Sequence, residues 1–156
     1  MLKLTLESLK GHFLKNKLDA QIQEETQQLY IIFRIDNADY PLFIRIYESG
    51  DLLQLLIFLP YELKKAAVAD TARLLHLINK EIDVPGFGID EISDVMFYRA
   101  VLPCFEHSID EAVLNAYINS LQIVCKTFSQ LIGNVAAGAT SFDQVFKKVK
   151  EAGSIQ

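Results

Sequence analysis

The sequence predicts an α+β fold, in which an antiparallel sheet is flanked by helices in the order α-β-β-β-β-α-β-β-α-α. One observation behind this prediction is residues 29–59, where apolar side chains alternate through three strands separated by two turns. The other is residues 113–135, where apolar side chains recur at steps of three and four, as on one face of an α-helix. That helix is long enough to cross a whole sheet.

The first expected elements are a helix and a strand. Leu2, Leu6, Leu9 and Phe13 recur at helical spacing, so about the first fifteen residues are expected to form an amphipathic helix that covers the sheet. In residues 18–23, apolar and polar side chains alternate. Such alternation is typical of a strand with one solvent-facing side, which suits the edge of a sheet.

Residues 29–59 are expected to form three strands that share one apolar face. If the turns at residues 36–39 and 48–51 close hairpins with an even number of loop residues, both hairpins place the same set of side chains on that face. The set is Leu29, Ile31, Phe33, Ile35, Leu42, Ile44, Ile46, Leu53, Leu55, Ile57 and Leu59.

The opposite face of these strands mixes rings, aliphatic side chains and two guanidinium groups, which is too apolar for a face meant only for water. Two interpretations remain open, burial under the chain's own helices or contact with a partner. The residues are Tyr30, Ile32, Arg34, Phe43, Arg45, Tyr47, Leu52, Gln54, Leu56 and Phe58.

The next elements are a helix and a hairpin. Pro60 ends the preceding strand and suits the entry to a helix with a buried stripe, which runs to about Ile82. Pro85 and Gly86 then turn the chain. Residues 87–92 and 95–102 are expected to form a second hairpin.

Two further helices are expected from capping boxes. In a capping box, two residues three positions apart at a helix start each accept a hydrogen bond with their side chain from the backbone amide of the other. Ser108 with Glu111 predicts the start of the long helix, and Gly138 suits its C-terminal cap. Its expected stripe runs from Val113 to Val135 and is widened by Leu114, Ile118, Cys125 and Ile132. Ser141 with Gln144 then predicts the start of a short final helix.

The composition is that of a globular chain. Its 156 residues fit a single domain spanning residues 1–156, with 51% hydrophobic and 22% charged residues. The longest apolar runs fall far short of the roughly 20 residues that a membrane helix needs, and no signal peptide is expected. A net charge of −5 with dispersed basic residues argues against binding nucleic acid. The two cysteines form no pairing framework, which favours the cytoplasm.

Catalytic patterns are weak. Cys104 and His107 lie between a strand end and an expected helix start, where a thiolate is favoured, so a small cysteine-dependent enzyme is the alternative function. A third alternative is a small-ligand sensor, in which Arg34, Arg45 and Arg99 bind an anion. Structural roles are the simpler interpretation of these residues.

No metal site is expected. The three histidines are far apart in the sequence, and the acidic residues around the second hairpin lack the spacing of a calcium loop. The pair Gly86 and Gly88 precedes a strand, whereas a dinucleotide site needs a third glycine and a helix. No cofactor is therefore expected.

Residues 74–103 carry a more specific pattern, at Leu77, Asn79, Pro85, Gly86, Tyr98 and Arg99. It resembles the YbjN-type families of the type III secretion chaperone-like fold, most closely a cyanobacterial branch, and the likeness covers residues 5–137. This resemblance implies a small, acidic, often dimeric protein that binds other polypeptides and has no enzyme activity. With its long helix and the short one after it, this chain has a larger helical part than the minimal chaperone fold.

The expected function is a non-catalytic protein-binding module, chaperone-like or a regulatory adaptor. A homodimer is also expected, because the apolar surface exceeds what the predicted helices can cover. Aromatic and arginine side chains dominate binding energetics in protein interfaces. The partner-binding surface is therefore expected on the mixed face, at Tyr30, Ile32, Phe43, Arg45, Tyr47, Leu56 and Phe58.

Overall fold

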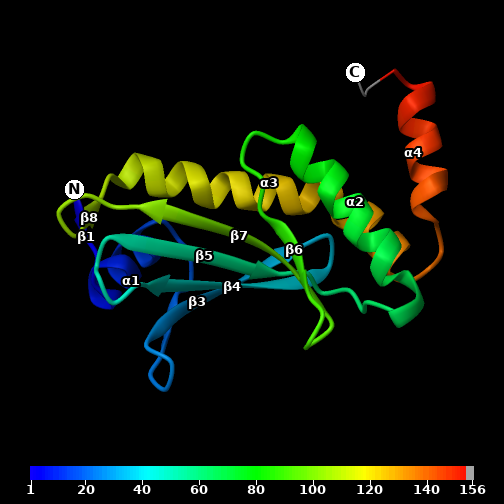
Figure 1. Ribbon diagram of the computed structural model, residues 1–156. Coiled ribbons are helices and arrows are strands. Elements are labelled where there is room, and N and C mark those ends of the chain that lie inside the picture. Colours follow the sequence, from blue (N-terminus) through cyan, green and yellow to red (C-terminus); the bar gives the residue numbers. More distant parts are fainter. Residues whose placement is uncertain (154–156) are drawn as a thin grey trace.

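The computed structural model describes residues 1–153 (Figure 1). Its helices and strands follow one another largely as the sequence predicts. Two very short strands, β1 and β8, are additional to the predicted order. The elements are β1 (Leu2–Lys3), α1 (Leu6–Lys15), β2 (Gln21–Gln23), β3 (Gln28–Ile35), β4 (Ala38–Ile46), β5 (Leu52–Phe58), the 3₁₀ turn η1 (Lys65–Ala67), α2 (Val68–Glu81), β6 (Phe87–Asp90), β7 (Val95–Pro103), β8 (Ser108–Ile109), α3 (Glu111–Ala136) and α4 (Phe142–Glu151).

The main sheet has six antiparallel strands in the order β2-β3-β4-β5-β7-β6. The turn between β3 and β4 is narrower than the predicted 36–39, because Ile35 already pairs with Ala38. Asp36 and Asn37 form this turn with φ values of 49° and 66°, which suit a two-residue hairpin. The loop still has an even length, so the predicted register is confirmed.

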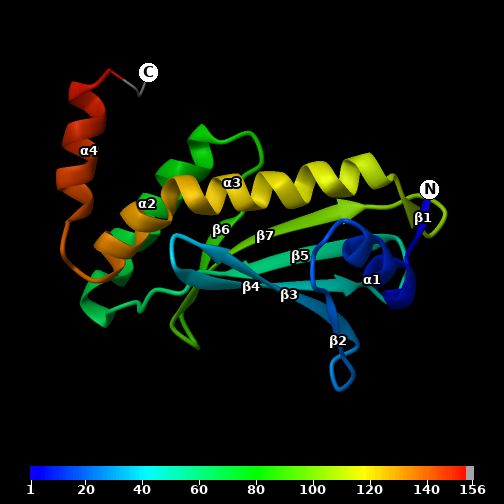
Figure 2. The ribbon, with the colours of Figure 1, turned by 180° about the vertical axis from the view of Figure 1, so that it is seen from behind.

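The apolar face of the sheet is covered by α1 and α3, which lie on the same side of it (Figure 2). Leu29, Leu42, Ile44 and Leu55 on this face have no exposed surface. The buried stripe of α3 is centred on the residues that were expected to widen it, whereas Val113 at its edge is 45% exposed. Its centre consists of Leu114, Ile118, Leu121, Cys125 and Ile132, with Tyr117, Val124, Phe128 and Leu131 partly buried beside it.

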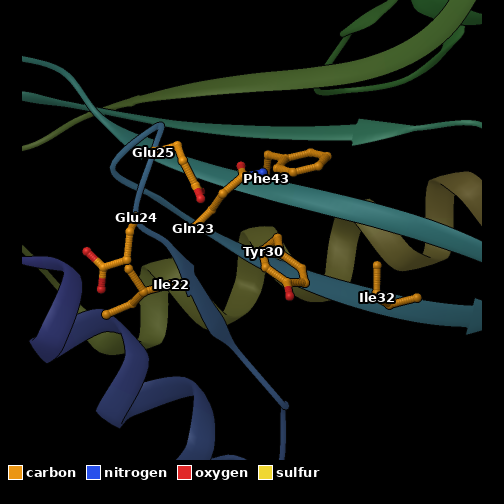
Figure 3. Close-up of a pocket in the computed structure, with 7 residues that line it drawn as sticks. All are labelled: Ile22, Gln23, Glu24, Glu25, Tyr30, Ile32 and Phe43. Atoms are coloured by element: carbon orange, nitrogen blue, oxygen red, sulfur yellow. The ribbon is translucent and has the colours of Figure 1, made fainter.

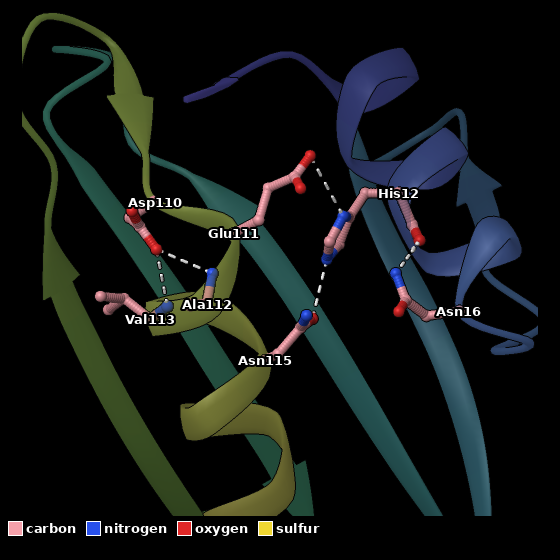
Figure 4. Close-up of polar contacts among 7 residues, drawn as sticks. All are labelled: His12, Asn16, Asp110, Glu111, Ala112, Val113 and Asn115. Atoms are coloured by element: carbon pink, nitrogen blue, oxygen red, sulfur yellow. Dashed lines mark hydrogen bonds and ion pairs between the residues drawn. The ribbon is translucent and has the colours of Figure 1, made fainter.

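The predicted capping box at the start of α3 is wrong. Asp110 is the N-cap, and its carboxylate accepts hydrogen bonds from the backbone amides of Ala112 and Val113 at 2.8 and 3.2 Å (Figure 4). Ser108 instead belongs to β8, which pairs with β1, and its hydroxyl donates to the Phe105 carbonyl oxygen. Pairing with the chain's first residues therefore delays the helix.

The first turns of α3 are also joined to α1. His12 is buried, and its Nε2 lies 2.8 Å from Asn115 Oδ1 (Figure 4). Its Nδ1 faces Glu111 Oε1 at 3.7 Å. This polar contact between α1 and α3 sits beside Phe13, which is almost completely buried. It fixes where α1 lies on the sheet.

The helix expected directly after Pro60 begins later, at Val68. The intervening segment packs against the C-terminal part of α3: Leu63 is buried, and the Lys64 amide donates to the Ala136 carbonyl oxygen at 3.0 Å. The Tyr61 ring lies so close to Gly133 that a Cβ there would be 2.7 Å from it. These contacts hold the chain extended before α2 begins.

The last two helices lie at one end of the molecule. Strand β7, the nine residues Val95–Pro103, ends at the side of the molecule far from α4. Helix α4 stands beside α2 and away from the sheet (Figure 1). The capping box of Ser141 and Gln144 at the start of α4 is confirmed. Within residues 1–153, none of the helices combines the length and the apolar character needed to cross a membrane.

Candidate functional site

All seven residues that the sequence proposes for partner binding lie on the side of the main sheet away from α1 and α3, here called the open face. Strand alternation places them there, because their neighbours along each strand point into the core. Figure 3 shows three of them on the side of the sheet opposite to α3. The seven are Tyr30, Ile32, Phe43, Arg45, Tyr47, Leu56 and Phe58.

An aromatic cluster forms the centre of the open face. The ring centroids of Tyr30 and Phe43 are 6.3 Å apart, and those of Phe43 and Phe58 are 5.7 Å apart in an edge-to-face arrangement. These rings are only partly buried, and Ile32 beside them is 51% exposed. The chain's own helices therefore leave this apolar surface uncovered.

Two open hollows lie where the open face meets the β2–β3 hairpin. One, of about 510 Å³, is lined by Tyr30, Ile32 and Phe43 together with Glu24 and Glu25 (Figure 3). The other, of about 580 Å³, includes Arg45 and Tyr47 in its lining. Five of the seven predicted residues thus border one of these two hollows, whereas Leu56 and Phe58 on β5 border neither.

The open face also extends onto β7, which the sequence-based list of site residues missed. Register places Phe97 beside Phe58 and Arg99 beside Leu56, and Val101 on the same side is 40% exposed. Alternation of these residues along 95–103 was visible in the sequence. The position of β7 next to β5 was not, because it depends on contacts between segments about forty residues apart.

The three arginines of the sensor alternative do not converge on one point. Arg34 forms an exposed ion pair with Asp39 at 2.8 Å. Arg45 lies over the Tyr47 ring at 4.7 Å, and Arg99 lies 5.9 Å from the centroid of the Phe97 ring. Since β5 separates the strands that carry Arg45 and Arg99, the arrangement offers no compact anion site.

The cysteine of the enzyme alternative is not activated. The Cys104 thiol donates to the Leu102 carbonyl oxygen at 3.5 Å, and burial together with the Asp51 carboxylate raises its pKa. The His107 ring instead faces the Gly50 carbonyl oxygen at 3.2 Å and Asp51 Oδ1 at 3.6 Å. Among the described residues, no hydrogen bond joins Cys104 to His107, so the pair lacks the contact that a nucleophile and its base require.

The histidines lie in three separate places. His12 contacts Asn115 between α1 and α3, His76 is exposed on α2, and His107 lies in the loop after β7. Across residues 1–153, no group of three or more His, Cys, Asp or Glu side chains has the geometry to hold a metal ion.

Most of the residues that carry the family-like pattern join the end of α2 to strands β6 and β7. The Asn79 carboxamide oxygen accepts from the Gly86 amide at 3.1 Å, and the Arg99 amide donates to the Gly86 carbonyl oxygen at 2.9 Å. A Cβ at Gly86 would lie 2.3 Å from the Arg99 carbonyl oxygen, so only glycine fits there. The Tyr98 hydroxyl donates to the Val84 carbonyl oxygen, and burial raises its pKa to about 12.

Solved structures that are similar to this chain include the following two. YbjN from E. coli, described as "a putative transcription regulator", matches with a TM-score of 0.58 and 10% sequence identity, over 79% of this chain and 89% of that one. A chain of the HopA1-SchA chaperone-effector complex matches with a TM-score of 0.49 and 16% identity, over 78% of this chain and 90% of that one. A search among curated proteins found no match.

The family resemblance inferred from residues 74–103 is confirmed. The model of the YbjN family, described as "Putative bacterial sensory transduction regulator", matches residues 5–134, close to the expected 5–137. The solved YbjN structure agrees with this chain in overall fold. This chain belongs to the YbjN family.

Proposed function

We propose that this protein binds a partner polypeptide on its open face and acts as a chaperone-like or regulatory adaptor without catalysis of its own. The observation that carries the proposal is the cluster of Tyr30, Phe43 and Phe58, whose rings pack together and still remain partly exposed. An apolar surface left uncovered in this way is typical of a protein interaction site.

The chemistry of the open face favours a segment with apolar side chains over the rings and acidic side chains near Arg45 and Arg99, away from the hollow lined by Glu24 and Glu25. Rings and guanidinium groups are enriched among the residues that dominate binding energy at interfaces. Arg45 and Arg99 form no ion pair with any carboxylate in residues 1–153, so both are available to a partner. The hollows beside Tyr30 and Tyr47 suit side chains that project from such a segment.

One further observation supports this role, and a second one concerns the compartment. The family is described as one of sensory transduction regulators, which matches an adaptor better than an enzyme. Both cysteines are free thiols, as is usual for proteins of a reducing compartment such as the cytoplasm.

The test compares partner binding by the Phe43→Ser/Phe58→Ser double variant with binding by the native chain. A photo-crosslinking residue at position 56 captures whatever lies on the open face in the native host, and mass spectrometry identifies it. We expect the double variant to lose the crosslinked partner. Ile123→Ser is the matched control, because Ile123 is a 65% exposed apolar residue on α3, away from the open face.

Folding is measured in parallel by circular dichroism and thermal melting. If the double variant loses its crosslinks but melts near the native temperature, the open face binds the partner. If each substitution instead costs the roughly 3–5 kcal/mol typical of buried Phe truncation, these rings are core and the proposal fails.

A second copy of this chain is the other occupant to be distinguished. We expect a homodimer in solution, so sedimentation should give a mass above the 17.7 kDa of the single chain. A mass of 17.7 kDa at all accessible concentrations would contradict the homodimer and leave the proposal of partner binding standing. If crosslinks form only between copies of this chain, the proposal that the open face binds a different polypeptide is rejected.

A further inference from the structure

A second candidate surface is the groove between α2 and α4, at the opposite end of the molecule from α1 (Figure 1). It has a volume of about 530 Å³. Its apolar lining consists of Leu77, Phe142, Phe146 and Ala72, and its polar lining consists of Arg73, His76 and Lys80. The residues matched by the family model end at 134, so α4 and this groove include a segment outside that match.

The first turn of α4 is held firmly on α2. The Phe142 amide donates to Asp70 Oδ2 at 3.0 Å, and Arg73 lies 4.1 Å from the centroid of the Phe142 ring. Phe142 and Val145 are buried, whereas Phe146 is stacked on Phe142 at 5.5 Å and is only partly buried. One wall of the groove therefore presents an apolar ring on a helix whose position is fixed.

The charge of the groove differs from that of the whole chain. Its lining includes the cations Arg73 and Lys80 and no carboxylate, although the chain carries a net charge of −5. Lys150 extends the basic border, 5.5 Å above the Phe146 ring. Asp143 and Glu81 approach Arg73 and Lys80 from outside the lining, at 3.5 and 3.1 Å. Exposed pairs of this kind contribute little, so a partner's carboxylates can replace them.

The shape of the groove favours a helix. The α2 residues in its lining lie at positions 72, 73, 76, 77 and 80, which is one face of the helix. They extend along about 12 Å, roughly two turns of an α-helix. The walls are helices whose backbone groups are already bonded, so they offer no edge for an added strand.

We propose that the groove between α2 and α4 binds an amphipathic helix of a partner protein, with aliphatic side chains against Leu77 and Phe146 and carboxylates against the basic border. This site is separate from the open face and does not depend on the function proposed for it. The charge complementarity predicts that affinity falls as salt concentration rises.

The test uses a fluorescein-labelled synthetic helix of about fourteen residues with leucines at i, i+3, i+4 and i+7 flanked by glutamates. Fluorescence anisotropy with the whole 156-residue chain should show saturable binding. We expect Lys80→Glu to weaken it by about fivefold, since an attraction becomes a repulsion at the rim. Lys126→Glu on α3 is the matched control, because Lys126 is also exposed but lies outside the groove, and it should leave the affinity unchanged.

Three further measurements decide the interpretation. Phe146→Ala should weaken peptide binding while the melting temperature of the protein stays near the native value. Phe43→Ser on the open face should leave peptide binding unchanged. A peptide with lysines in place of the glutamates should bind at least about tenfold more weakly. Equal affinity for the two peptides, equal effects of Lys80→Glu and Lys126→Glu, loss of binding in Phe43→Ser, or binding to anionic vesicles but not to the acidic peptide would each overturn the proposal.

Discussion

The side-chain amide of Asn79 pairs with the backbone of Phe87 as a neighbouring strand would, accepting from its amide nitrogen and donating to its carbonyl oxygen, both at 3.0 Å. Phe87 begins β6, an edge strand of the main sheet. Asn79 lies in the last turns of α2, so this one side chain joins the helix to the sheet and satisfies backbone groups that the edge leaves unpaired.

Replacing Asn79 by Ala should destabilise the protein. The substitution leaves the partly buried amides of Gly86 and Phe87 without their acceptor, which costs about 1–3 kcal/mol. Urea denaturation followed by circular dichroism measures the loss. Asn119→Ala is the control, because Asn119 is exposed on α3 and should change stability by less than about 0.5 kcal/mol. Equal effects of the two substitutions would mean that the Asn79 amide contributes no more than a surface residue.

The start of α3 provides a second test, which separates the observed cap from the predicted one. Asp110→Ala removes the acceptor of the Ala112 and Val113 amides and should cost about 1 kcal/mol. Ser108→Ala removes only a hydroxyl that donates to the Phe105 carbonyl oxygen, so it should cost less than about 0.5 kcal/mol. The same denaturation experiment compares the two. A larger loss of stability for Ser108→Ala than for Asp110→Ala would support the predicted capping box of Ser108 with Glu111.

The two capping predictions show what a local sequence pattern can predict and what it cannot. Ser141 with Gln144 and Ser108 with Glu111 have the same spacing, and only the first forms a capping box. What separates them is the pairing of Ser108 with Lys3, over one hundred residues earlier in the chain. The β3–β5 register was predictable because its turns are local.

The candidate site follows the same rule. Alternation along β3, β4 and β5 was enough to place Tyr30, Phe43 and Phe58 on one face. Whether helices cover that face depends on where α1 and α3 pack, and contacts such as that of His12 with Asn115 decide it. No local pattern contains that information, so the sequence left both interpretations of the face open.

Alkaline pH should destabilise the protein through Tyr98. Burial raises the pKa of its hydroxyl to about 12, whereas a tyrosine in an unfolded chain titrates near about 10. Between these values the unfolded chain loses a proton that the folded state keeps, so the free energy of unfolding falls as pH rises. The contribution is fully present below about pH 10. Burial also raises the pKa of Tyr40, which acts in the same direction.

The variant Tyr98→Phe isolates this effect. It should be less stable than the native chain at neutral pH by about 1 kcal/mol, because the hydrogen bond to the Val84 carbonyl oxygen is lost. Its stability should then fall less steeply above about pH 10. Tyr47→Phe is the control, since the Tyr47 hydroxyl makes only a 3.4 Å contact with Gln54 on the open face. Parallel pH profiles for Tyr98→Phe and the native chain would contradict the assignment.

Thiol reactivity tests the enzyme alternative directly. Because burial and the Asp51 carboxylate raise the pKa of Cys104, its thiolate fraction at neutral pH is below that of a free thiol. We expect iodoacetamide to modify Cys104 no faster than a small free thiol, and His107→Ala to leave the rate unchanged. Burial raises the pKa of Cys125 to about 12, so this thiol should react only when the chain unfolds.

Mass spectrometry of the alkylated peptides follows both residues in one experiment, and Cys125 serves as the internal reference for the folded state. Urea should accelerate Cys125 strongly and Cys104 only slightly, because Cys104 is partly exposed whereas Cys125 has no exposed surface. A catalytic cysteine behaves differently, since its reactivity depends on a folded contact with its base. Rapid modification of Cys104 in the folded chain, lost both in urea and in His107→Ala, would support the enzyme over the adaptor.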